Sequence, residues 1–590
     1  MAANIAMASL PLLLFLCMGV TVYSDAFDQR YKHGDFVPLY ATKIGPSHNP
    51  SETYRYYDMP FCSPEHVTEK KETFGEFLNG DHLVDAPYKL EFRVNKESEI
   101  ACGKKLSKGE VAQFRNAILK DYYFQMYYDD LPIWSFFGRT EEGNRADEFK
   151  YLLYKNINFD ILYNNNRVIE INVWINSSDT LDITEDKEID MEFKYSVKWR
   201  ETDISFKERM EKYVMFFSTH HGRSNWFLAL DPCLNVLIFV GLFSSFIFGL
   251  LKKDIVRYSL DDEESVYEQE ETGWKNIHGD VFRYPKHKSW FAAILGSGTQ
   301  LLALAIFIFI LGLVGVFYPY NKGVLSTALI VIYALTSSIA GYTATSFYCQ
   351  LDGTNWVRCL LLTGCLFPAP LFLMFCFLNN VALVYNFATA LPFSAIVAIV
   401  LMWSFVMSPL LVLGGIAGKN NKTEFQAPCR TTKCPREIPP LPWYQKTIPQ
   451  MVIAGVLPFI AIYMELFLVL ASMWGHKIYY TYGVLFMVFV VLVIVTAFVA
   501  IALVYFQLAA EDHEWWWRSV LRGGSTSLFI FGQCLYYYFA RTDMSGLMQT
   551  SSFFGYMACI CYGIFLLLGT VGFYISLVLV RYLYGSIKCE

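Results

Sequence analysis

Charged residues are scarce in this sequence. Asp, Glu, Lys and Arg together make up 17% of its 590 residues, while hydrophobic residues make up 54%. A typical soluble domain is about 25% charged, so this composition argues against an ordinary soluble protein. The net charge of −6 and the lack of a basic patch also argue against nucleic-acid binding.

The motifs of common soluble enzymes are missing as well. The sequence holds no P-loop, no G-x-S-x-G, no H-E-x-x-H and no paired C-x-x-C. No pair of catalytic residues supports an intramembrane enzyme either. We therefore expect a non-enzymatic protein that needs no cofactor and no metal.

The sequence is rich in long runs of apolar residues. Nine follow one another between Leu228 and Val580. Each holds roughly twenty residues, enough to cross a hydrocarbon layer of ~30 Å as a helix at ~1.5 Å per residue. The pattern predicts a polytopic α-helical membrane protein with nine transmembrane helices within residues 229–580. The approximate limits of the runs are 232–251, 291–318, 323–348, 357–378, 388–416, 451–473, 479–507, 523–540 and 552–580.

The N-terminus is typical of a targeting segment. Residues 1–24 carry an apolar core from Leu10 to Val22 and end in Ser24. A run of about 13 residues is too short to be a tenth span, and the residues before the predicted cut after Ser24 suit signal peptidase. We predict a cleaved secretory signal peptide that delivers the following segment to a lumen.

Residues 25–228 form a polar segment that is long enough to be a domain of its own. Between Asp25 and Trp226 it holds 35 Asp and Glu against 27 Lys and Arg. Residues 168–175 and 191–199 alternate between apolar and polar side chains, which predicts strands. Residues 108–128 have a polar first turn and aromatic residues on one side, which predicts a helix. We therefore predict an N-terminal β-rich lumenal domain with one or two helices.

Two expectations follow from the lumenal compartment. Cys62 and Cys102 are the only cysteines of this domain, and an oxidising lumen favours a disulfide between them over two buried thiols. The bridge closes a loop of about forty residues, for a stabilisation of ~3–4 kcal/mol. Asn176 opens an Asn-Ser-Ser sequon and is expected to carry a glycan.

Positive charge is divided unequally between the two sets of loops. With the N-terminal domain in the lumen, the cytosolic segments hold 18 Lys and Arg, whereas the lumenal loops between spans hold three. The positive-inside rule therefore agrees with the signal peptide and with an odd number of spans. The C-terminus is then cytosolic. Basic residues beside the membrane, such as Lys252 and Lys253, are placed to contact anionic membrane lipid.

A proline-rich segment, 418–450, joins the fifth and sixth runs. Its prolines predict an extended strap across the cytosolic face instead of a folded domain. Cys429 and Cys434 within it form a lone C-x4-C without a second ligand pair, so a zinc site is not expected.

One acidic residue lies deep within a span. Glu465 is part of the sixth run, where a carboxyl group is costly and marks a functional candidate. The alternative is a protonated or paired structural glutamate that faces the bundle, and the sequence leaves both open. Prolines also interrupt or mark spans four to six, and broken helices can line a transporter cavity or be plain kinks. These prolines are Pro368, Pro370, Pro392, Pro409 and Pro458.

Three carboxylates and a histidine follow the seventh run, at 511–514. Adjacent residues on a helix point in different directions, so these four are not expected to share a metal ion. Three tryptophans, Trp515, Trp516 and Trp517, come directly after them. We interpret them as an aromatic belt at the membrane interface.

The last ten residues, 581–590, form a cytosolic tail that is too short to fold. Such a tail can act as an address or as a small ligand. It ends in Lys588-Cys589-Glu590. A lysine two positions before a terminal acid occurs by chance in roughly one chain in a hundred of average composition.

Seven segments spread over the chain carry a resemblance to a known family. They cover nearly the whole chain in the right order. Together they resemble the nonaspanins, the transmembrane-nine superfamily, and within it they resemble plant members. The segments are 45–62, 273–283, 296–300, 436–444, 505–512, 515–519 and 584–588.

The resemblance implies a Golgi and endosome membrane protein that assists the sorting, trafficking and membrane localisation of other transmembrane proteins. In the family, a lysine, any residue, and a terminal Asp or Glu form a signal that binds the COPI coat and retains the protein in the Golgi. That signal corresponds here to Lys588, Cys589 and Glu590. An aromatic and aliphatic element for export from the endoplasmic reticulum corresponds by position to Val580, Tyr582 and Tyr584.

Two functions of different classes follow. In the first, the chain sorts transmembrane cargo proteins, and small residues such as Gly296, Gly298 and Gly341 let cargo helices approach closely. The alternative is a secondary transporter or channel that uses Glu465 and the broken helices. Solute flux through the purified protein distinguishes the second from the first.

Overall fold

The computed structural model of the chain describes residues 30–585 with several gaps. The predicted signal peptide, most of the first predicted span and the tail residues 586–590 lie outside the described residues. The gaps are 48–51, 65–66, 71–81, 143–148, 177–178, 210–237, most of 239–272, 318–322, 389, 422, 475–481, 543 and 545.

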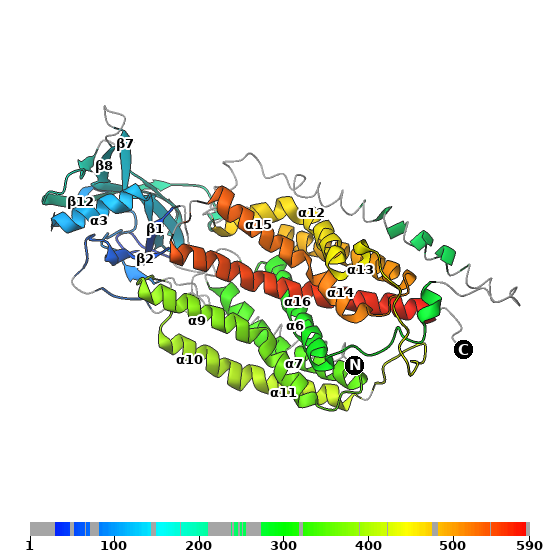
Figure 1. Ribbon diagram of the computed structural model, residues 1–590. Helices are drawn as coiled ribbons and strands as arrows, with labels where there is room; N and C mark the ends of the chain where they lie inside the picture. Colours follow the sequence, from blue (N-terminus) through cyan, green and yellow to red (C-terminus); the bar gives the residue numbers. More distant parts are fainter. Residues whose placement is uncertain are drawn as a thin grey trace, which may run out of the picture.

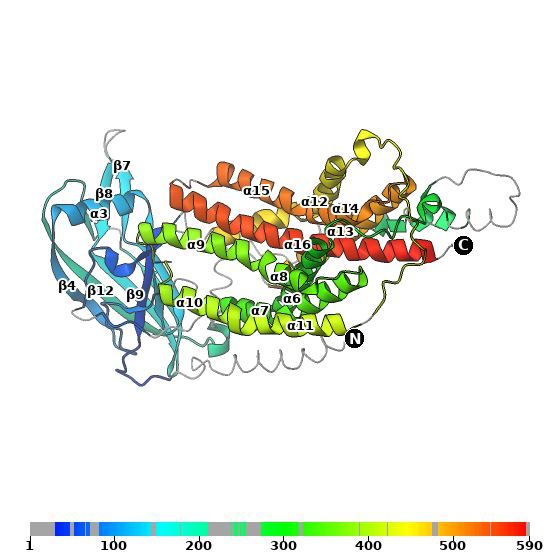
Figure 2. The same ribbon diagram turned by 60° about the horizontal axis from the view of Figure 1, so that its bottom comes forward.

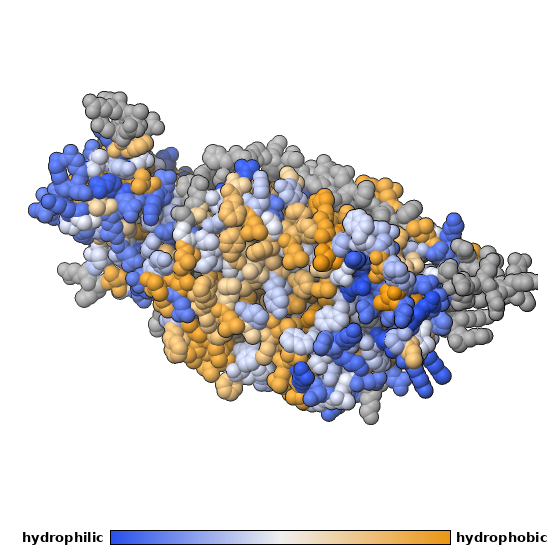
Figure 3. Space-filling model, in the orientation of Figure 1, coloured by the Kyte–Doolittle hydropathy of each residue, from blue (hydrophilic) through white to orange (hydrophobic). Residues whose placement is uncertain are grey.

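A domain of strands sits at one end of a long helical bundle (Figure 1 and Figure 2). We call this the domain end of the bundle and the opposite end the loop end. Figure 3 shows a hydrophobic band around the middle of the visible face, between hydrophilic surfaces at the two ends. Such a band suits contact with the hydrocarbon core of a bilayer, and the chain is a multi-pass membrane protein.

The N-terminal domain contains twelve named strands in three sheets. They are β1 Leu39–Pro46, β2 Tyr54–Arg55, β3 Val84–Asp85, β4 Lys96–Leu106, β5 Tyr122–Tyr128, β6 Leu131–Phe136, β7 Gly138–Glu142, β8 Phe149–Tyr154, β9 Asn156–Asn164, β10 Arg167–Trp174, β11 Thr180–Asp182 and β12 Ile189–Glu201. The first sheet has the order β2-β1-β5-β6, with β3 beside β1. The second has the order β10-β9-β12-β4, in which β12 is parallel to β9, and the third has the order β11-β8-β7.

The predicted strands at 168–175 and 191–199 are confirmed as β10 and β12. The side chains that point inward from the sheets form one hydrophobic core. Within it the ring of Phe61 lies 5.3 Å from Phe114, 5.6 Å from Phe137 and 6.0 Å from Phe193, all in edge-on arrangements. Aromatic pairs at these distances add to the stabilisation that burial provides.

The helix predicted at 108–128 is correct only in its first half. Helix α3 covers Lys108–Leu119 and begins with a capping box between Ser107 and Glu110. The chain turns at Asp121, whose φ of 49° is left-handed, and continues as β5. Aromatic side chains favour strands, and those of β5 reach the domain core. The helical prediction for 120–128 is therefore wrong.

Seven stretches of the described residues are helical, long and apolar enough to cross a membrane. Together with the shorter α15, they match eight of the nine predicted runs; the first run lies mostly outside the described residues. The helices are α6 Lys288–Val314, α7 Val324–Gln350, α8 Trp356–Leu366, α9 Pro368–Val384, α10 Phe393–Met402, α11 Ser408–Asn420, α12 Thr447–Trp474, α13 Tyr482–Ala509, α14 Trp515–Gly524, α15 Thr526–Arg541 and α16 Leu547–Gly585.

Prolines lie in three of these spans. Pro368 opens α9 and separates it from α8, and Pro392 precedes α10. Pro409 lies in the first turn of α11, directly after a π-helical turn at Trp403–Met407. Pro458 lies inside the continuous helix α12. Two of the prolines thus begin helices, where a missing N–H group costs little.

The small residues proposed to receive cargo helices are used inside the bundle. A Cβ atom added to Gly296 would lie 2.7 Å from the Cβ atom of Ala344 on α7. One added to Gly298 would overlap Thr570 on α16, and one added to Gly341 would overlap the carbonyl oxygen of Leu411 on α11. The expectation that these glycines face cargo is wrong, because each allows close packing between helices of this chain.

Helix α16 is the longest of the described elements, with 39 residues. At ~1.5 Å per residue it is about 58 Å long, well beyond a hydrocarbon layer of ~30 Å. Both ribbon views show it running from the N-terminal domain to the loop end (Figure 1 and Figure 2).

Candidate functional site

Four segments that are distant in sequence pack together at the loop end of the bundle. We call this group the end cluster. It consists of residues 273–286, 425–436, 505–518 and 573–584. The described residues between Asn421 and Pro442 contain no helix or strand, in keeping with the predicted strap.

Aromatic rings form the interior of the end cluster. The ring of Trp515 stacks on Trp516 at 4.8 Å and on Phe573 of α16 at 5.7 Å. Trp274 meets Tyr584 edge-on at 5.6 Å, and the Tyr584 hydroxyl donates a hydrogen bond to the Trp274 carbonyl oxygen at 2.5 Å. The end of α16 is therefore fixed to the segment that precedes α6.

The aromatic belt predicted at 515–517 is wrong for two of its three members. Trp515 and Trp516 are 0% and 3% exposed. The indole N–H of Trp515 donates to the carbonyl oxygen of Val281, and that of Trp517 donates to the carbonyl oxygen of Lys286, each at 2.9 Å. Because Phe573 and the 273–286 segment cover these rings, the first two tryptophans stabilise the protein interior instead of contacting lipid.

Glu511 connects three segments of the end cluster. Its carboxylate accepts hydrogen bonds from the backbone N–H of Gly273 at 3.0 Å and from Asn276 Nδ2 at 3.4 Å. Arg436, in the strap, forms an ion pair with it at 3.1 Å. Glu511 has a left-handed φ of 59°, which turns the chain between α13 and α14.

Asp280 binds the strap at a second point, through hydrogen bonds. It accepts hydrogen bonds from Arg283 at 2.5 Å, from Thr432 Oγ1 at 3.1 Å and from the backbone N–H of Arg436 at 3.1 Å. Burial raises the pKa of the Asp280 carboxyl, but these hydrogen bonds outweigh it and hold that pKa below its usual value. The strap is thus tied to the bundle by charge-assisted bonds.

The acidic and histidine residues at 511–514 lie in this turn, not on a helix as expected. Asp512 is fully buried, pairs with Arg518 and also caps the backbone N–H of Glu514. Since Glu511 is bound to Arg436, the two carboxylates have separate structural partners.

A second junction lies at the domain end, around Glu52. This buried carboxylate accepts hydrogen bonds from the hydroxyls of Tyr54 and Tyr122, both at 2.9 Å, and from the side-chain amide of Gln549 on α16. The ring of Tyr54 also lies 5.0 Å from Phe387, in the loop between α9 and α10.

Backbone contacts extend this junction. The N–H of Ala388 donates to the carbonyl oxygen of Thr53 at 2.9 Å. His82 Nε2 lies 3.1 Å from the carbonyl oxygen of Ala388. The 52–54 segment thereby docks the N-terminal domain on two separate helical hairpins. Sequence reasoning missed this role, although the segment belongs to the stretch 45–62 that carries the family resemblance.

Comparison with known proteins identifies the family. A family model described as endomembrane protein 70 matches residues 53–547. Transmembrane 9 superfamily member 3 of Arabidopsis thaliana is 64% identical over 591 residues, which cover 98% of this chain and 100% of that protein. The chain belongs to the transmembrane 9 superfamily, the nonaspanins.

Relatives of this nonaspanin also occur outside plants. Transmembrane 9 superfamily member 1 of Mus musculus is 41% identical over 572 residues, 95% of this chain and 94% of the relative. A Dictyostelium discoideum protein named "Putative phagocytic receptor 1b" is 40% identical over 580 residues, 98% of each chain. No solved structure matches the chain.

Five of the seven segments that carry the family resemblance lie in the end cluster or begin at its edge. Those at 273–283, 505–512 and 515–519 lie in the end cluster, and those at 436–444 and 584–588 begin at its edge. The resemblance of this nonaspanin to its family is therefore concentrated at the loop end and at the Glu52 junction.

The candidate export residues lie at the end of α16. Val580 and Tyr584 are fully buried in the end cluster, whereas Tyr582 is 62% exposed. Of the three, Tyr582 is the one whose side chain another protein can reach directly. Lys588, Cys589 and Glu590 lie outside the described residues.

Glu465 lies in α12 and is only 3% exposed. Its helix face also carries Ala461 and Ile462, which pack with α13 and α15 side chains in one hydrophobic cluster. Among the described residues, no basic side chain forms an ion pair with Glu465. Its burial fits a structural glutamate that faces the bundle as well as a functional one.

The two remaining predicted sites lie in the N-terminal domain. The structure joins Cys62 and Cys102 by a disulfide, with Cα atoms 6.0 Å apart, and the bridge anchors β4 to the Phe61 region of the core. Asn176 follows the end of β10 and is exposed, and the other two sequon residues lie outside the described residues.

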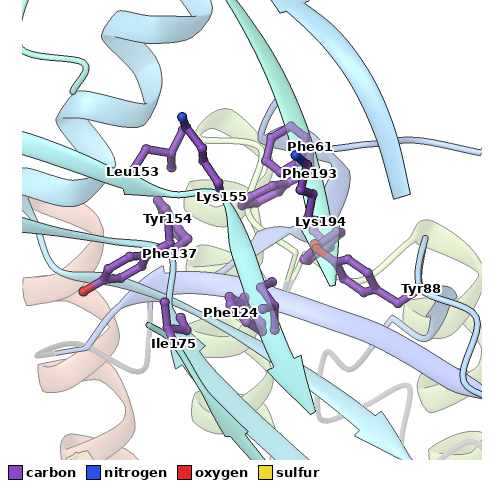
Figure 4. Close-up of a pocket in the computed structure, with 12 residues that line it drawn as sticks. Phe61, Tyr88, Phe124, Phe137, Leu153, Tyr154, Lys155, Ile175, Phe193 and Lys194 are labelled. Atoms are coloured by element: carbon purple, nitrogen blue, oxygen red, sulfur yellow. The ribbon is translucent and has the colours of Figure 1, made fainter. Parts of the chain in front are cut away.

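A cavity also opens in the N-terminal domain (Figure 4). It is narrow, with room for about one water molecule. Phe61, Phe137 and Phe193 lie around it with Lys155 and Lys194. Tyr56, Tyr88 and Tyr154 also line it, and among the described residues of the lining there is no Asp, Glu, histidine or cysteine.

Proposed function

We propose that this nonaspanin assists the sorting and membrane localisation of other transmembrane proteins in the Golgi and endosomes. The observation that carries the proposal is family membership over nearly the whole chain, including a relative named as a phagocytic receptor. In this proposal the chain performs no enzymatic step.

The proposed orientation places the N-terminal domain in the lumen and the loop end in the cytosol. The excess of Lys and Arg in the loop-end segments supports it. The tail then leaves α16 on the cytosolic side, where Lys588, Cys589 and Glu590 bind the COPI coat. In an extended chain Lys588 and Glu590 point the same way, so one surface can contact both charges.

Cargo helices do not bind at the glycine positions, because other helices of this chain already pack against them. A surface that remains open lies on α10, where Phe393, Val397 and Val400 are exposed. In this proposal transmembrane cargo contacts such apolar outer faces and the N-terminal domain.

A survey of surface membrane proteins in cells with and without the chain tests the proposal. We expect a defined set of multi-pass proteins to leave the cell surface when the chain is removed, and to return when it is restored. An unchanged surface population would contradict the sorting function.

The alternative, a transporter that uses Glu465, is tested with purified protein in liposomes. Glu465→Gln preserves size and burial, so a sorting protein should keep its abundance, location and cargo. Solute flux that the wild type supports and Glu465→Gln abolishes would favour the transporter instead.

A further inference from the structure

Arg522 is a buried cation beside the end cluster that forms no ion pair with a described residue. It lies near the end of α14 and is 1% exposed. Its Nη2 atom donates to Gln507 Oε1 at 2.7 Å and to Gln450 Oε1. Its Nε and Nη1 atoms are buried without a hydrogen-bond partner. Both of its partners are neutral, so these bonds leave its positive charge in place.

The carboxylates nearest in sequence are already engaged. Asp512 pairs with Arg518, and Glu511 pairs with Arg436. Among the described residues, no acidic side chain forms an ion pair with Arg522. An unpaired buried cation is destabilising, so a compensating anion is favoured.

The other unsatisfied groups around Arg522 are also able to donate. Gln507 Nε2 and Thr526 Oγ1 are buried without a partner. Thr526 follows Arg522 by four residues, at the start of α15. Arg522, Gln507 and Thr526 thus each carry an unused N–H or O–H group, and such donors suit the oxygen atoms of an anion.

The depth of Arg522 indicates where the anion comes from. Gln450 is the fourth residue of α12, and Gln507 lies two residues before the end of α13. Arg522 is therefore about one helical turn from the loop ends of both spans, at ~1.5 Å per residue. The exposed Trp443 and Tyr444 precede α12 at this level, and such residues mark the membrane interface. Phospholipid phosphates lie in this layer.

We propose that Arg522, Gln507 and Thr526 form a binding site for a phosphate-bearing anion at the loop end of the bundle. The guanidinium group supplies the charge and N–H groups for phosphate oxygens, and the amide and hydroxyl supply further donors. The anion is the headgroup phosphate of a phospholipid or free phosphate. It stabilises the junction of α12, α13 and α14.

Thermal unfolding of the purified full-length protein in detergent tests the site. Phosphatidylinositol, phosphatidylcholine and inorganic phosphate are titrated in separate arms. We expect saturable stabilisation by phosphatidylinositol with a weaker response to phosphatidylcholine. An equal response to inorganic phosphate would identify the free anion as the ligand. If none of the three stabilises the wild type, the proposal is wrong.

Two variants and a control locate the effect. Arg522→Gln should weaken the response about ten- to hundredfold, the size of a lost charge-assisted contact. Arg358→Gln, which removes an exposed arginine at the start of α8, should leave it unchanged. An equal loss in both variants would show non-specific attraction and overturn the site.

Gln507→Glu keeps the test decisive if Arg522→Gln fails to fold. It places a carboxylate 2.7 Å from the guanidinium group at nearly constant volume. We expect a folded protein with a higher unfolding temperature in the absence of ligand and no response to phosphatidylinositol or phosphate. A Gln507→Glu protein that responds like the wild type would overturn the proposal.

Discussion

The side-chain amide of Gln549, on the first turn of α16, donates a hydrogen bond to the carboxylate of Glu52, 497 residues earlier in the chain. Glu52 is held in place by Tyr54 and Tyr122 of the N-terminal domain. This bond therefore joins a soluble domain directly to a transmembrane helix.

Gln549→Leu should loosen this junction while both parts stay folded. The variant removes one of three donors to a buried carboxylate, at a cost of about 1–3 kcal/mol. We expect faster amide hydrogen exchange at 52–55 and 387–388, measured by mass spectrometry. Gln113→Leu is the matched control, because Gln113 bonds to Asp58 within the same domain. Equal exchange in the two variants would show that Gln549 does not hold the domain.

Trp515→Ala should destabilise the bundle by about 3–5 kcal/mol, the usual cost of truncating a buried aromatic residue. The variant removes the stack with Phe573 and the bond to Val281. The fall in unfolding temperature, measured in detergent, checks this. Trp443→Ala removes a tryptophan that is 74% exposed and should have little effect. If the two variants lose the same stability, the interior role of Trp515 is contradicted.

Cys102→Ser should destabilise the N-terminal domain by ~4 kcal/mol, since the bridge to Cys62 spans a sequence separation of 40 residues. Non-reducing peptide mapping of the mature wild type should recover the two cysteines linked. Cys434→Ser changes an exposed cysteine in the strap and serves as the control. Free thiols at both positions in the mature protein would refute the pairing.

Glycosylation should distinguish the two ends of the bundle. Asn176 should carry a glycan, and Asn176→Gln should remove the mobility shift that a glycosidase produces. Asn421 also opens a sequon, but its side chain donates to the Tyr342 hydroxyl at the loop end, on the proposed cytosolic side. Asn421→Gln should leave the shift unchanged. Sugar on Asn421 would reverse the proposed orientation.

The tail should act as an address that is separate from the fold. Lys588→Ala should weaken coat binding and let the protein move from the Golgi to later compartments, as seen by microscopy and coat pull-down. Lys588 is three residues beyond α16, so the unfolding temperature should not change. Lys446→Ala, in a loop-end segment before α12, is a control for loss of positive charge. A variant that stays in the Golgi with normal coat binding would contradict the tail signal.

The spans were the most predictable part of the chain. Runs such as 291–318 and 323–348 correspond closely to α6 and α7, because a bilayer demands about twenty apolar residues in sequence. The boundary between α3 and β5 was not predictable from the same rule. Aromatic residues suit one side of a helix or a buried strand, and packing in the folded domain decides between them.

Contacts between segments that are distant in the chain also could not be predicted from the sequence. The tryptophans at 515–517 have the composition of a membrane belt, and only the folded contacts with Phe573 show Trp515 and Trp516 to be interior. In the same way, the sequence does not distinguish a glycine that contacts cargo from one that packs inside the bundle. The close approach of Leu411 on α11 shows that Gly341 is of the second kind. Glu465 was predicted only to lie within a span, and its burial does not decide between a structural and a functional role.

Helix α16 is long enough to transmit a movement from the domain end of the bundle to the loop end. Glu52 holds one end and Trp274 holds the other, so a movement of the N-terminal domain must either break the Gln549 bond or tilt the helix. A tilt of about 5° over ~58 Å displaces the far end by about 5 Å. The tail follows that far end in sequence, so a binding event at the N-terminal domain has a direct mechanical path to the start of the tail.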